Sequence, residues 1–214
     1  MPEERIVPTT KPATVVTPVI LIDGNAIDQT IQVDSITVRK EVNRVPQARV
    51  VILDGEASSE KFQVSNGDLF IPGKEIEIKC GYQGDLFTLF KGIITGHSIK
   101  IRSGGSSLLV AECRDKAVKM TIGRHSRYFL NMKDSDIISD ISGAYPGIRV
   151  TTEATGVTHN EMVQYDVTDW DFMIARAEVN GQLCIADDGV LEIKPPALSQ
   201  SPVLSLIYGA TVLD

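Results

Sequence analysis

Cysteines and aromatic residues are scarce in this chain. Its 214 residues include three cysteines, six phenylalanines, five tyrosines and one tryptophan. Cys80, Cys113 and Cys184 lie far apart in apolar, strand-like segments, and no Cys-x-x-Cys motif or Cys/His cluster occurs. Cysteines placed in this way are typical of buried thiols in a reducing compartment. The pattern therefore indicates against a disulfide framework and against a thiolate metal site.

A long apolar run and an excess of positive charge are also missing. No stretch approaches the roughly 20 apolar residues that span a bilayer, and the first 16 residues carry acids and prolines where a secretory signal has an apolar segment. We therefore expect synthesis in the cytoplasm and no contact with a membrane. With 21 basic and 28 acidic residues, the formal net charge is -7, which excludes the usual electrostatic footprint of a nucleic-acid binder.

Catalytic and metal-binding motifs are not found either. The three histidines, His97, His125 and His159, are widely spaced, with no ligand at metal-binding spacing, and are expected to be lone and exposed. No Gly-x-Ser-x-Gly elbow, Walker loop or dinucleotide fingerprint is present, and residues 104–107 are typical of a turn. Residues 134–136 lack the glycine and glutamate of a calcium loop and favour a helix cap. The sequence predicts no enzyme, catalytic residue, metal or cofactor, although a spatial pair of carboxylates for glycoside hydrolysis stays open.

What the chain does have is a β pattern in its first half. The hydrophobic content of 43% is that of a globular protein with a core. After an extended arm at 1–16, short apolar alternations separated by turns predict seven or so strands over 17–116. They lie at 18–22, 31–38, 48–53, 76–82, 87–94, 98–102 and 107–113, with a turn at 104–105. Strands at this spacing favour a sandwich or barrel, and we expect a closed β-barrel.

One of these strands changes phase. Ile31 and Val33 alternate on odd numbers, whereas Ile36 and Val38 alternate on even numbers, so the pattern slips by one at residues 34–35. Because a slip of one residue turns every side chain to the other face, a β-bulge is expected at this point.

The second half of the chain predicts a smaller α+β unit over 117–186. Helical spacing appears at 134–145 and ends before Pro146. A strand is expected at 148–152 and a polar segment up to Val163. The segments 183–186 and 190–193 flank Asp187-Asp188-Gly189, which is typical of a three-residue hairpin loop with the glycine at positive φ.

The lone tryptophan stands between two aspartates in the segment VTDWDFMIARAEVNGQL, residues 167–183. An Asp-x-Asp beside an aromatic ring can bind a cation or supply a general base. At a helix start, however, the same residues have local structural roles. Thr168 can be the N-cap, Asp171 can reach back to it as in a capping box, and Asp169 meets the positive end of the helix dipole.

The apolar residues of this segment fit the same interpretation. Val167 and Phe172 occupy the positions of a hydrophobic staple, and Gly181 stands where a helix ends in the left-handed conformation. Trp170 shares one helix face with Met173, Ile174 and Ala177. We therefore expect Thr168, Asp169, Trp170, Asp171 and Phe172 to form a helix cap and core, while a binding role remains the alternative.

Five strings carry a resemblance to a known family. They are ITVRKEVNRVPQARVVILDG (36–55), FIPGKEIEIKCGY (70–82), LFKGIITG (89–96), KAVKMTIGRHSRYF (116–129) and QYDVTDWDFMIARAEVNGQL (164–183). In this order they resemble the Vgr family, the baseplate hub and spike proteins of phage tails, type VI secretion systems and extracellular injection particles. The resemblance covers 17–214, and the first half is closer to the spike proteins of extracellular particles.

The resemblance implies a structural role without catalysis. It implies a homotrimer in which each subunit contributes two similar β-barrels, so that a pseudo-sixfold ring joins the hexameric inner tube to the threefold spike. The implied partners are inner tube proteins, baseplate proteins and a spike tip or effector, with no nucleic acid and no membrane. The particle would be assembled from chains made in the cytoplasm and could be released from the cell.

The resemblance also implies a division of the chain. Residues 17–116 would be the first barrel, 117–186 an α+β insertion and 187–214 the beginning of a second barrel. Hub proteins of this family continue through that barrel to an oligosaccharide-binding-like domain and a β-helical needle, so we expect this chain to be an N-terminal portion. Two other functions stay open: a carbohydrate-binding β-module, and a cell-wall hydrolase associated with a tail.

Overall fold

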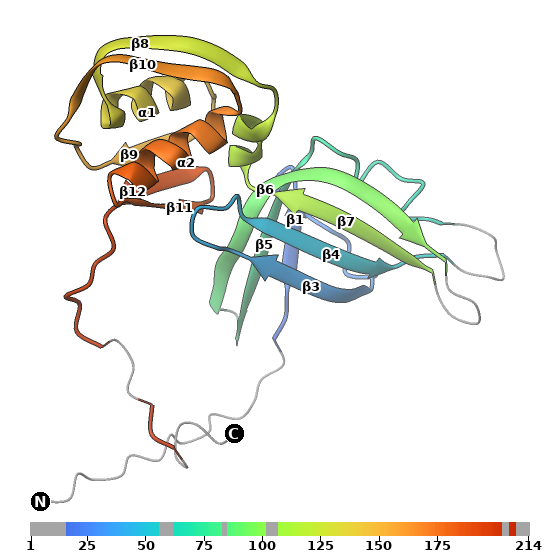
Figure 1. Cartoon of the computed structure of the whole chain (residues 1–214). Helices are drawn as coiled ribbons and strands as arrows, with labels where there is room; N and C mark the ends of the chain where they lie inside the picture. The colour runs from blue at the N-terminus through green and yellow to red at the C-terminus, as the bar shows by residue number, and fades with distance from the viewer. Residues whose placement is uncertain (1–15, 56–61, 83–84, 102–106, 203–205, 209–214) are drawn as a thin grey trace, which may run out of the picture.

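The protein folds into two lobes, each with a buried core of its own, in a computed structural model (Figure 1). The structure describes residues 16–55, 62–82, 85–101, 107–202 and 206–208. Of the expected features, the arm at 1–16 except its last residue, the turn at 104–105, and residues 203–205 and 209–214 of the segment expected to begin a second barrel lie outside the described residues. The first lobe is an antiparallel sheet and the second mixes helices with two small sheets (Figure 1).

The first lobe is one sheet of seven strands. Their order across the sheet is β2-β1-β5-β6-β7-β4-β3, and neighbouring strands are antiparallel. The strands are β1 (Val19–Ile22), β2 (Asn25–Ala26), β3 (Val33–Arg39), β4 (Gln47–Leu53), β5 (Glu75–Tyr82), β6 (Asp85–Lys100) and β7 (Leu108–Arg114).

The sheet curls around a core but does not close. Alternate side chains of β1, β4, β5, β6 and β7 are buried in one cluster, and partly buried residues of β3 pack against it. Among the described residues, however, hydrogen-bond pairing ends at β2 on one side and at β3 on the other. A groove of about 450 Å³, lined by Pro18, Ile27 and Val33 among others, lies between these edges. The closed barrel that the sequence favoured is therefore not found among the described residues; the chain passes between edge strands β2 and β3 through the irregular segment 27–32.

Two details of this sheet bear on the sequence pattern. The expected bulge is confirmed, because the pairing of β3 with β4 shifts between Val33 and Ser35. The strands expected at 87–94 and 98–102 are instead one strand, β6. A second register shift between Ile94 and Gly96 lets β6 bend while it remains paired with β7, so the interrupted pattern marked a bulge and not a turn.

The second lobe has three layers (Figure 1). A two-stranded antiparallel ribbon of β8 (His125–Lys133) and β10 (Thr158–Val167) covers one side of α1 (Asp134–Gly143) and α2 (Asp169–Val179). The other side is a three-stranded sheet in the order β11-β12-β9. Its strands are β9 (Arg149–Thr152), β11 (Leu183–Asp187) and β12 (Val190–Lys194), and a 3-10 helix, η1 (Lys116–Thr121), leads in from β7.

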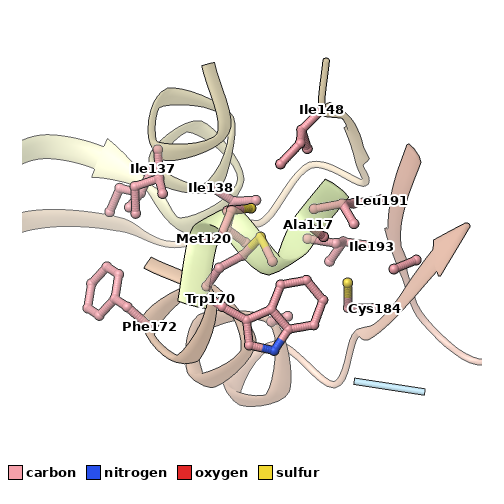
Figure 2. Close-up of a cluster of buried hydrophobic side chains, with 14 of the residues drawn as sticks. Ala117, Met120, Ile137, Ile138, Ile148, Trp170, Phe172, Cys184, Leu191 and Ile193 are labelled. Carbon is pink, nitrogen blue, oxygen red and sulfur yellow. The ribbon is translucent and has the colours of Figure 1, made fainter. Parts of the chain in front are cut away.

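The helices bury their apolar stripes between these layers. Figure 2 shows Trp170 and Phe172 of α2 on one side of the cluster and Ile137 and Ile138 of α1 on the other, with Met120 between Trp170 and Ile138. All five side chains are buried, and Phe129 of β8 stacks on Phe172 with ring centroids 6.0 Å apart. Burying a large side chain stabilises a fold by about 1.5–3 kcal/mol, so this cluster is the main support of the lobe.

Several elements of this lobe differ from the sequence prediction. The ribbon strands β8 and β10 were missed, because exposed apolar residues such as Tyr128 and Leu130 break the polar alternation expected of a solvent-facing strand. The hairpin loop has two residues and not three, since Asp187 pairs with Val190. Asp188 and Gly189 have φ of 51° and 76°, as a type I′ turn requires. Strand β12, which lies beyond the boundary expected at residue 186, hydrogen-bonds with β9 and β11 of this lobe.

Candidate functional site

Helix α2 begins at the Asp-Trp-Asp motif. Thr168 is the N-cap, and its hydroxyl oxygen accepts a hydrogen bond from the backbone N–H of Asp171 at 3.1 Å. The same hydroxyl donates to the carboxylate of Asp171 at 2.6 Å, where the sequence suggested a bond to the N-cap backbone. The helix ends at Asn180, followed by Gly181 with φ of 66°. The first and last turns of α2 are thus satisfied by local contacts.

Asp169 of α2 is fully buried, and its carboxylate links this helix to β8, to β10 and to the turn after α1. One carboxylate oxygen accepts from the guanidinium of Arg127 on β8 at 2.7 Å and from the hydroxyl of Tyr145, after α1, at 2.6 Å. The other accepts from the amide of Gln164 on β10 at 2.7 Å. Burial by itself would raise the pKa of Asp169, but the hydrogen bonds from Gln164 and Tyr145 and the charge of Arg127 outweigh burial and lower the pKa.

The pKa of Tyr145 shifts in the opposite direction. Burial, followed by its hydrogen bond to the Asp169 carboxylate, raises the pKa of the Tyr145 hydroxyl to about 12. The phenol therefore stays protonated and keeps donating to Asp169 throughout the physiological pH range.

Asp134 forms a second buried cluster at the start of α1. Its carboxylate accepts from Nε of Arg176 at 2.6 Å and from the second guanidinium nitrogen at 3.0 Å, in a bidentate pair. Asn180 donates at 2.8 Å, and His159 lies 3.0 Å away. Burial raises the pKa of Asp134, but the hydrogen bonds from Arg176, Asn180 and His159 more than offset it and lower the pKa to about 2. The carboxylate is therefore ionised whenever the protein is folded near neutral pH.

The histidines are not the lone residues that the sequence suggested: His97 is exposed as expected but has a partner, and His125 and His159 are partly buried. His159 contacts Asp134, and His125 lies 3.9 Å from the carboxylate of Asp169. His97 makes a 3.0 Å contact through Nδ1 with the backbone oxygen of Phe70. Their partners are distant in sequence, and no spacing signal in the chain could have revealed these contacts.

The chemistry open to these clusters is limited. Asp169 is fully buried, and Asp134 is 1% exposed, so a substrate cannot reach either carboxylate in the folded protein. Each carboxylate is also committed to an arginine and to further donors. Across the part of the chain that the structure describes, no group of three or more His, Cys, Asp or Glu side chains could hold a metal ion. None of the described helices has the length and apolar content needed to cross a membrane.

The junction between the lobes is a third candidate site. The loop between β3 and β4 reaches the edge of β11, as Figure 1 shows. The backbone N–H of Asn43 donates to the carbonyl of Cys184, and the N–H of Cys184 donates to Oδ1 of Asn43, both at 2.8 Å. Nδ2 of Asn43 donates to Glu178 of α2 at 2.9 Å. Asn43 thus pairs with β11 as an additional strand residue would.

Further polar contacts fix the same junction. Asp115, buried between β7 and η1, accepts from the N–H of Ala117 at 2.8 Å and from the N–H of Gly189 at 2.9 Å. Burial raises its pKa. Ion pairs join Lys40 to Asp187 and Lys116 to Glu75. Val45 packs against the core of the second lobe. The two lobes are therefore joined by hydrogen bonds, ion pairs and apolar contact.

None of these partners was found from the sequence. Arg127, Tyr145 and Gln164 lie 42, 24 and 5 residues from Asp169, and Asn43 lies 141 residues from Cys184. The one local hint of the junction was the asparagine at position 43. In the structure, Asn43 adopts a left-handed backbone conformation with φ of 59°. Asparagine is among the few residues that adopt this conformation at low cost, but the sequence does not say what it contacts.

Comparison with known proteins gives both a family and a fold. A family model described as the Alg8 N-terminal domain matches residues 12–214. No match was found among curated proteins. A tail protein from Neisseria meningitidis MC58 superposes with a TM-score of 0.64 at 15% identity, over 88% of this chain and 53% of that protein. The 43 kDa tail protein of prophage MuSo2 from Shewanella oneidensis gives 0.63 at 13% identity, over 84% and 53%.

A third solved structure belongs to a secretion system. The c3393 protein of E. coli, described as a component of the type VI secretion system with structural similarity to the T4 bacteriophage tail proteins gp27 and gp5, gives a TM-score of 0.59 at 15% identity. The match covers 81% of this chain and 48% of that protein. The chain thus spans about half the length of these proteins. At the level of the fold, the resemblance to Vgr-family hub and spike proteins is confirmed, and so is a mainly β fold with a smaller α+β part.

Proposed function

We propose that this chain, which belongs to the Alg8 N-terminal domain family, is a structural component of the baseplate hub of a contractile injection system. The observation that carries this proposal is the two-lobed fold, which is shared over most of the chain with phage tail proteins and with a type VI secretion component. Function does not follow from fold alone, so the buried clusters and the lobe junction supply the second argument. In the part of the chain that the structure describes, two buried carboxylates, Asp134 and Asp169, are paired with arginines and serve to hold the second lobe together.

The proposal includes an assembly. Three copies would form a ring that joins the hexameric inner tube to the spike, in contact with inner tube proteins, other baseplate proteins and a spike tip or effector. A solved relative named as a PdpA-VgrG complex of Francisella is an assembly of a VgrG protein with another chain, which supports partners of this kind. The chains would be made in the cytoplasm and then built into the particle. A threefold ring repeats one head-to-tail interface, so trimerisation requires two different surfaces on each subunit that are complementary to each other.

We also propose roles for the units of the chain. The sheet lobe at 17–116 and an α+β lobe from 117 would be its two folding units. The expected end of the α+β lobe at 186 is moved here to 194, because β12 pairs with β9 and β11. Thr168, Asp169, Trp170, Asp171 and Phe172 would act as architecture, because each has a capping, network or core contact. The chain would catalyse no reaction.

The test is to measure copy number and shape together. We expect the complete protein to have the native mass of three copies, and electron micrographs to show a ring with threefold symmetry. The same protein should show no clearing of peptidoglycan in a zymogram. A monomer with measurable hydrolase turnover would contradict both the hub role and the absence of catalysis.

A second candidate, carbohydrate binding, is favoured by one observation. Two aromatic side chains, Tyr128 on β8 and Tyr165 on β10, are 79% and 80% exposed. Tyr128 pairs with Val163, so both tyrosines project from the outer face of the ribbon. Exposed aromatic rings can stack on sugars. A glycan array would test this candidate: binding that is lost in Tyr128→Ala but kept in Phe87→Ala, an exposed aromatic of the other lobe, would favour it over the hub.

A further inference from the structure

Asparagine is followed by glycine at two places in the chain, Asn66-Gly67 and Asn180-Gly181. In such a pair the backbone nitrogen of the glycine can attack the side-chain amide carbon of the asparagine. Glycine leaves this nitrogen unshielded because it has no Cβ atom, and its wide range of backbone angles lets the two atoms approach each other. Asparagine before glycine is therefore the arrangement in which the side-chain amide is lost most readily. Whether each pair reacts depends on what holds its amide.

The folded protein holds the amide of Asn180. Its Nδ2 donates to the carboxylate of Asp134 and to the backbone oxygen of Arg176, both at 2.8 Å. Asp134 is buried and is itself bound by the guanidinium of Arg176. The amide carbon of Asn180 cannot turn toward Gly181 unless both hydrogen bonds break and the buried carboxylate loses a donor. This pair is therefore protected by the fold.

The amide of Asn66 is not held in this way. Asn66 and Gly67 are both exposed, in the turn segment after Phe62. Among the residues that the structure describes, the Asn66 side chain has no hydrogen-bond partner. The attacking nitrogen, that of Gly67, donates to the carbonyl oxygen of Val64 at 3.2 Å. This distance is at the long end of the usual range of about 2.7–3.2 Å, and an exposed turn bond opens at little cost in free energy. The attack on Asn66 is therefore open.

The turn is anchored to the first lobe next to this pair. Asp54, directly after β4, is buried, and its carboxylate accepts from the backbone N–H of Val64 at 3.1 Å and from that of Ser65 at 2.7 Å. The hydroxyl of Ser65 donates to the same carboxylate. Burial raises the pKa of Asp54, but the hydrogen bonds from Ser65 and Val64 outweigh burial and lower the pKa. The carboxylate is thus ionised near neutral pH and holds the two residues that precede Asn66.

We propose that Asn66 is a site of spontaneous deamidation, and that its isoaspartate product releases the turn from Asp54. The nitrogen of Gly67 loses its proton and forms a bond to Cγ of Asn66. The bond between Cγ and Nδ2 breaks, and Nδ2 leaves as ammonia with that proton. Water then adds to one of the two carbonyl carbons of the five-membered imide, and the ring bond from that carbon to nitrogen breaks. The overall reaction takes up one water and releases one ammonia, and it requires no oxidant, metal or cofactor.

The two ring openings give different products. Breaking the bond to Cγ gives aspartate, which keeps the backbone and adds one negative charge to a protein of net charge -7. Breaking the bond to the backbone carbonyl carbon gives isoaspartate, whose chain runs through Cβ and Cγ and is one carbon longer. The longer chain moves the N–H of Gly67 away from the carbonyl of Val64, whose own N–H donates to Asp54. Isoaspartate therefore weakens the anchor, whereas aspartate leaves the backbone contacts in place.

The experiment follows both pairs in the same sample and does not depend on the hub role. The folded protein is incubated at mildly alkaline pH over weeks, digested under mildly acidic conditions and mapped by mass spectrometry, with electron-transfer fragmentation to separate isoaspartate from aspartate. We expect deamidation at Asn66 to be at least about tenfold faster than at Asn180, because only the amide of Asn180 is held by hydrogen bonds. In urea, where the fold is lost, the two pairs should react at similar rates.

Two variants test the separate steps. Gly67→Ala adds a Cβ beside the attacking nitrogen and should slow the reaction at Asn66 by about tenfold or more. This Cβ would lie 3.3 Å from the backbone oxygen of Gln63, and φ of Gly67 is not in the left-handed region, so a small shift of the exposed turn accommodates it. Asn66→Asp adds only the charge and is the matched control for isoaspartate. The amides of Val64 and Ser65 should exchange hydrogen faster in aged, isoaspartate-rich protein than in fresh protein, and in Asn66→Asp they should exchange as in fresh protein.

Three outcomes would overturn the proposal. The first is deamidation at Asn66 that is no faster than at Asn180 in the folded protein, or none at Asn66 while the unfolded protein reacts. The second is an unchanged rate in Gly67→Ala, which would exclude attack by this nitrogen. The third is exchange of the Val64 and Ser65 amides that is equally fast in isoaspartate-rich and fresh protein, which would show that the anchor is kept.

Discussion

The carboxylate of Asp134, the first residue of α1, lies 2.6 Å from Nε of Arg176, toward the end of α2. This pair ties the two helices of the second lobe together at a buried position. Substitution of Asp134 by Asn removes the charge and leaves Arg176 without its counter-ion. Loss of one partner of a deeply buried pair costs about 3–5 kcal/mol, but the guanidinium keeps some access to water, so we expect about 2 kcal/mol of lost stability. Urea unfolding followed by Trp170 fluorescence measures this difference.

A control on the same helix separates the pair from a general effect of charge. Asp140→Asn removes an exposed acid from α1 and should change the stability by no more than about 0.5 kcal/mol. Equal destabilisation by the two substitutions would contradict a specific role for the Asp134–Arg176 pair.

The same pair predicts a dependence on pH. The pKa of Asp134 is lowered from 3.8 to about 2, so the unfolded chain takes up a proton at higher pH than the folded protein does. The group therefore stabilises the fold fully above pH 4, by about 2 kcal/mol, and this contribution is lost as the pH falls from about 4 to about 2. The stability difference between the wild-type protein and Asp134→Asn, measured across this range, should be constant above about pH 5 and shrink below about pH 4. A difference that stays constant through the whole acid range would contradict the lowered pKa.

The junction between the lobes depends on Asn43. Asn43→Gly keeps the backbone conformation at φ of 59° but removes the side-chain bonds to Cys184 and Glu178. We expect a loss of about 1–3 kcal/mol and faster hydrogen exchange of the Cys184 amide. Asn131→Gly is the control, because Asn131 also has positive φ, at 51°, and is exposed. Unchanged exchange at Cys184 in Asn43→Gly would show that the loop is not held by this residue.

A close approach of two strands requires Gly92 on β6. A Cβ atom at this position would lie 2.2 Å from the carbonyl oxygen of Arg114 on β7, which is backbone and cannot move aside without breaking the sheet. Gly92→Ala should therefore lower the stability by about 2 kcal/mol or more, seen as a lower melting temperature. Gly96→Ala on the same strand meets no atom within 4 Å and should melt close to the wild type. Similar melting temperatures for the two variants would contradict the close packing of β6 on β7.

The fold class followed from local pattern because strands and helix starts are encoded over a few residues. The phase slip at 34–35 located a bulge, and the turn at 188–189 was found to within one residue. The prediction of strands failed where the pattern was ambiguous. The bent strand β6 was divided in two. The ribbon of β8 and β10 was missed because Tyr128 and Leu130 are exposed. The domain bounds and the role of the Asp-Trp-Asp residues stay predictions.

The sequence by itself determined that the chain has a core, a mainly β first half, a helix that begins at Thr168 and a surface of net negative charge. These properties depend on side-chain periodicity, capping chemistry and composition, which act over short distances along the chain. Only the tertiary structure decided that the sheet stays open, that Asp134 and Asp169 are buried with arginines, and that Asn43 joins the lobes. Those contacts join residues up to 141 positions apart, and packing in three dimensions selects such partners where no local pattern does.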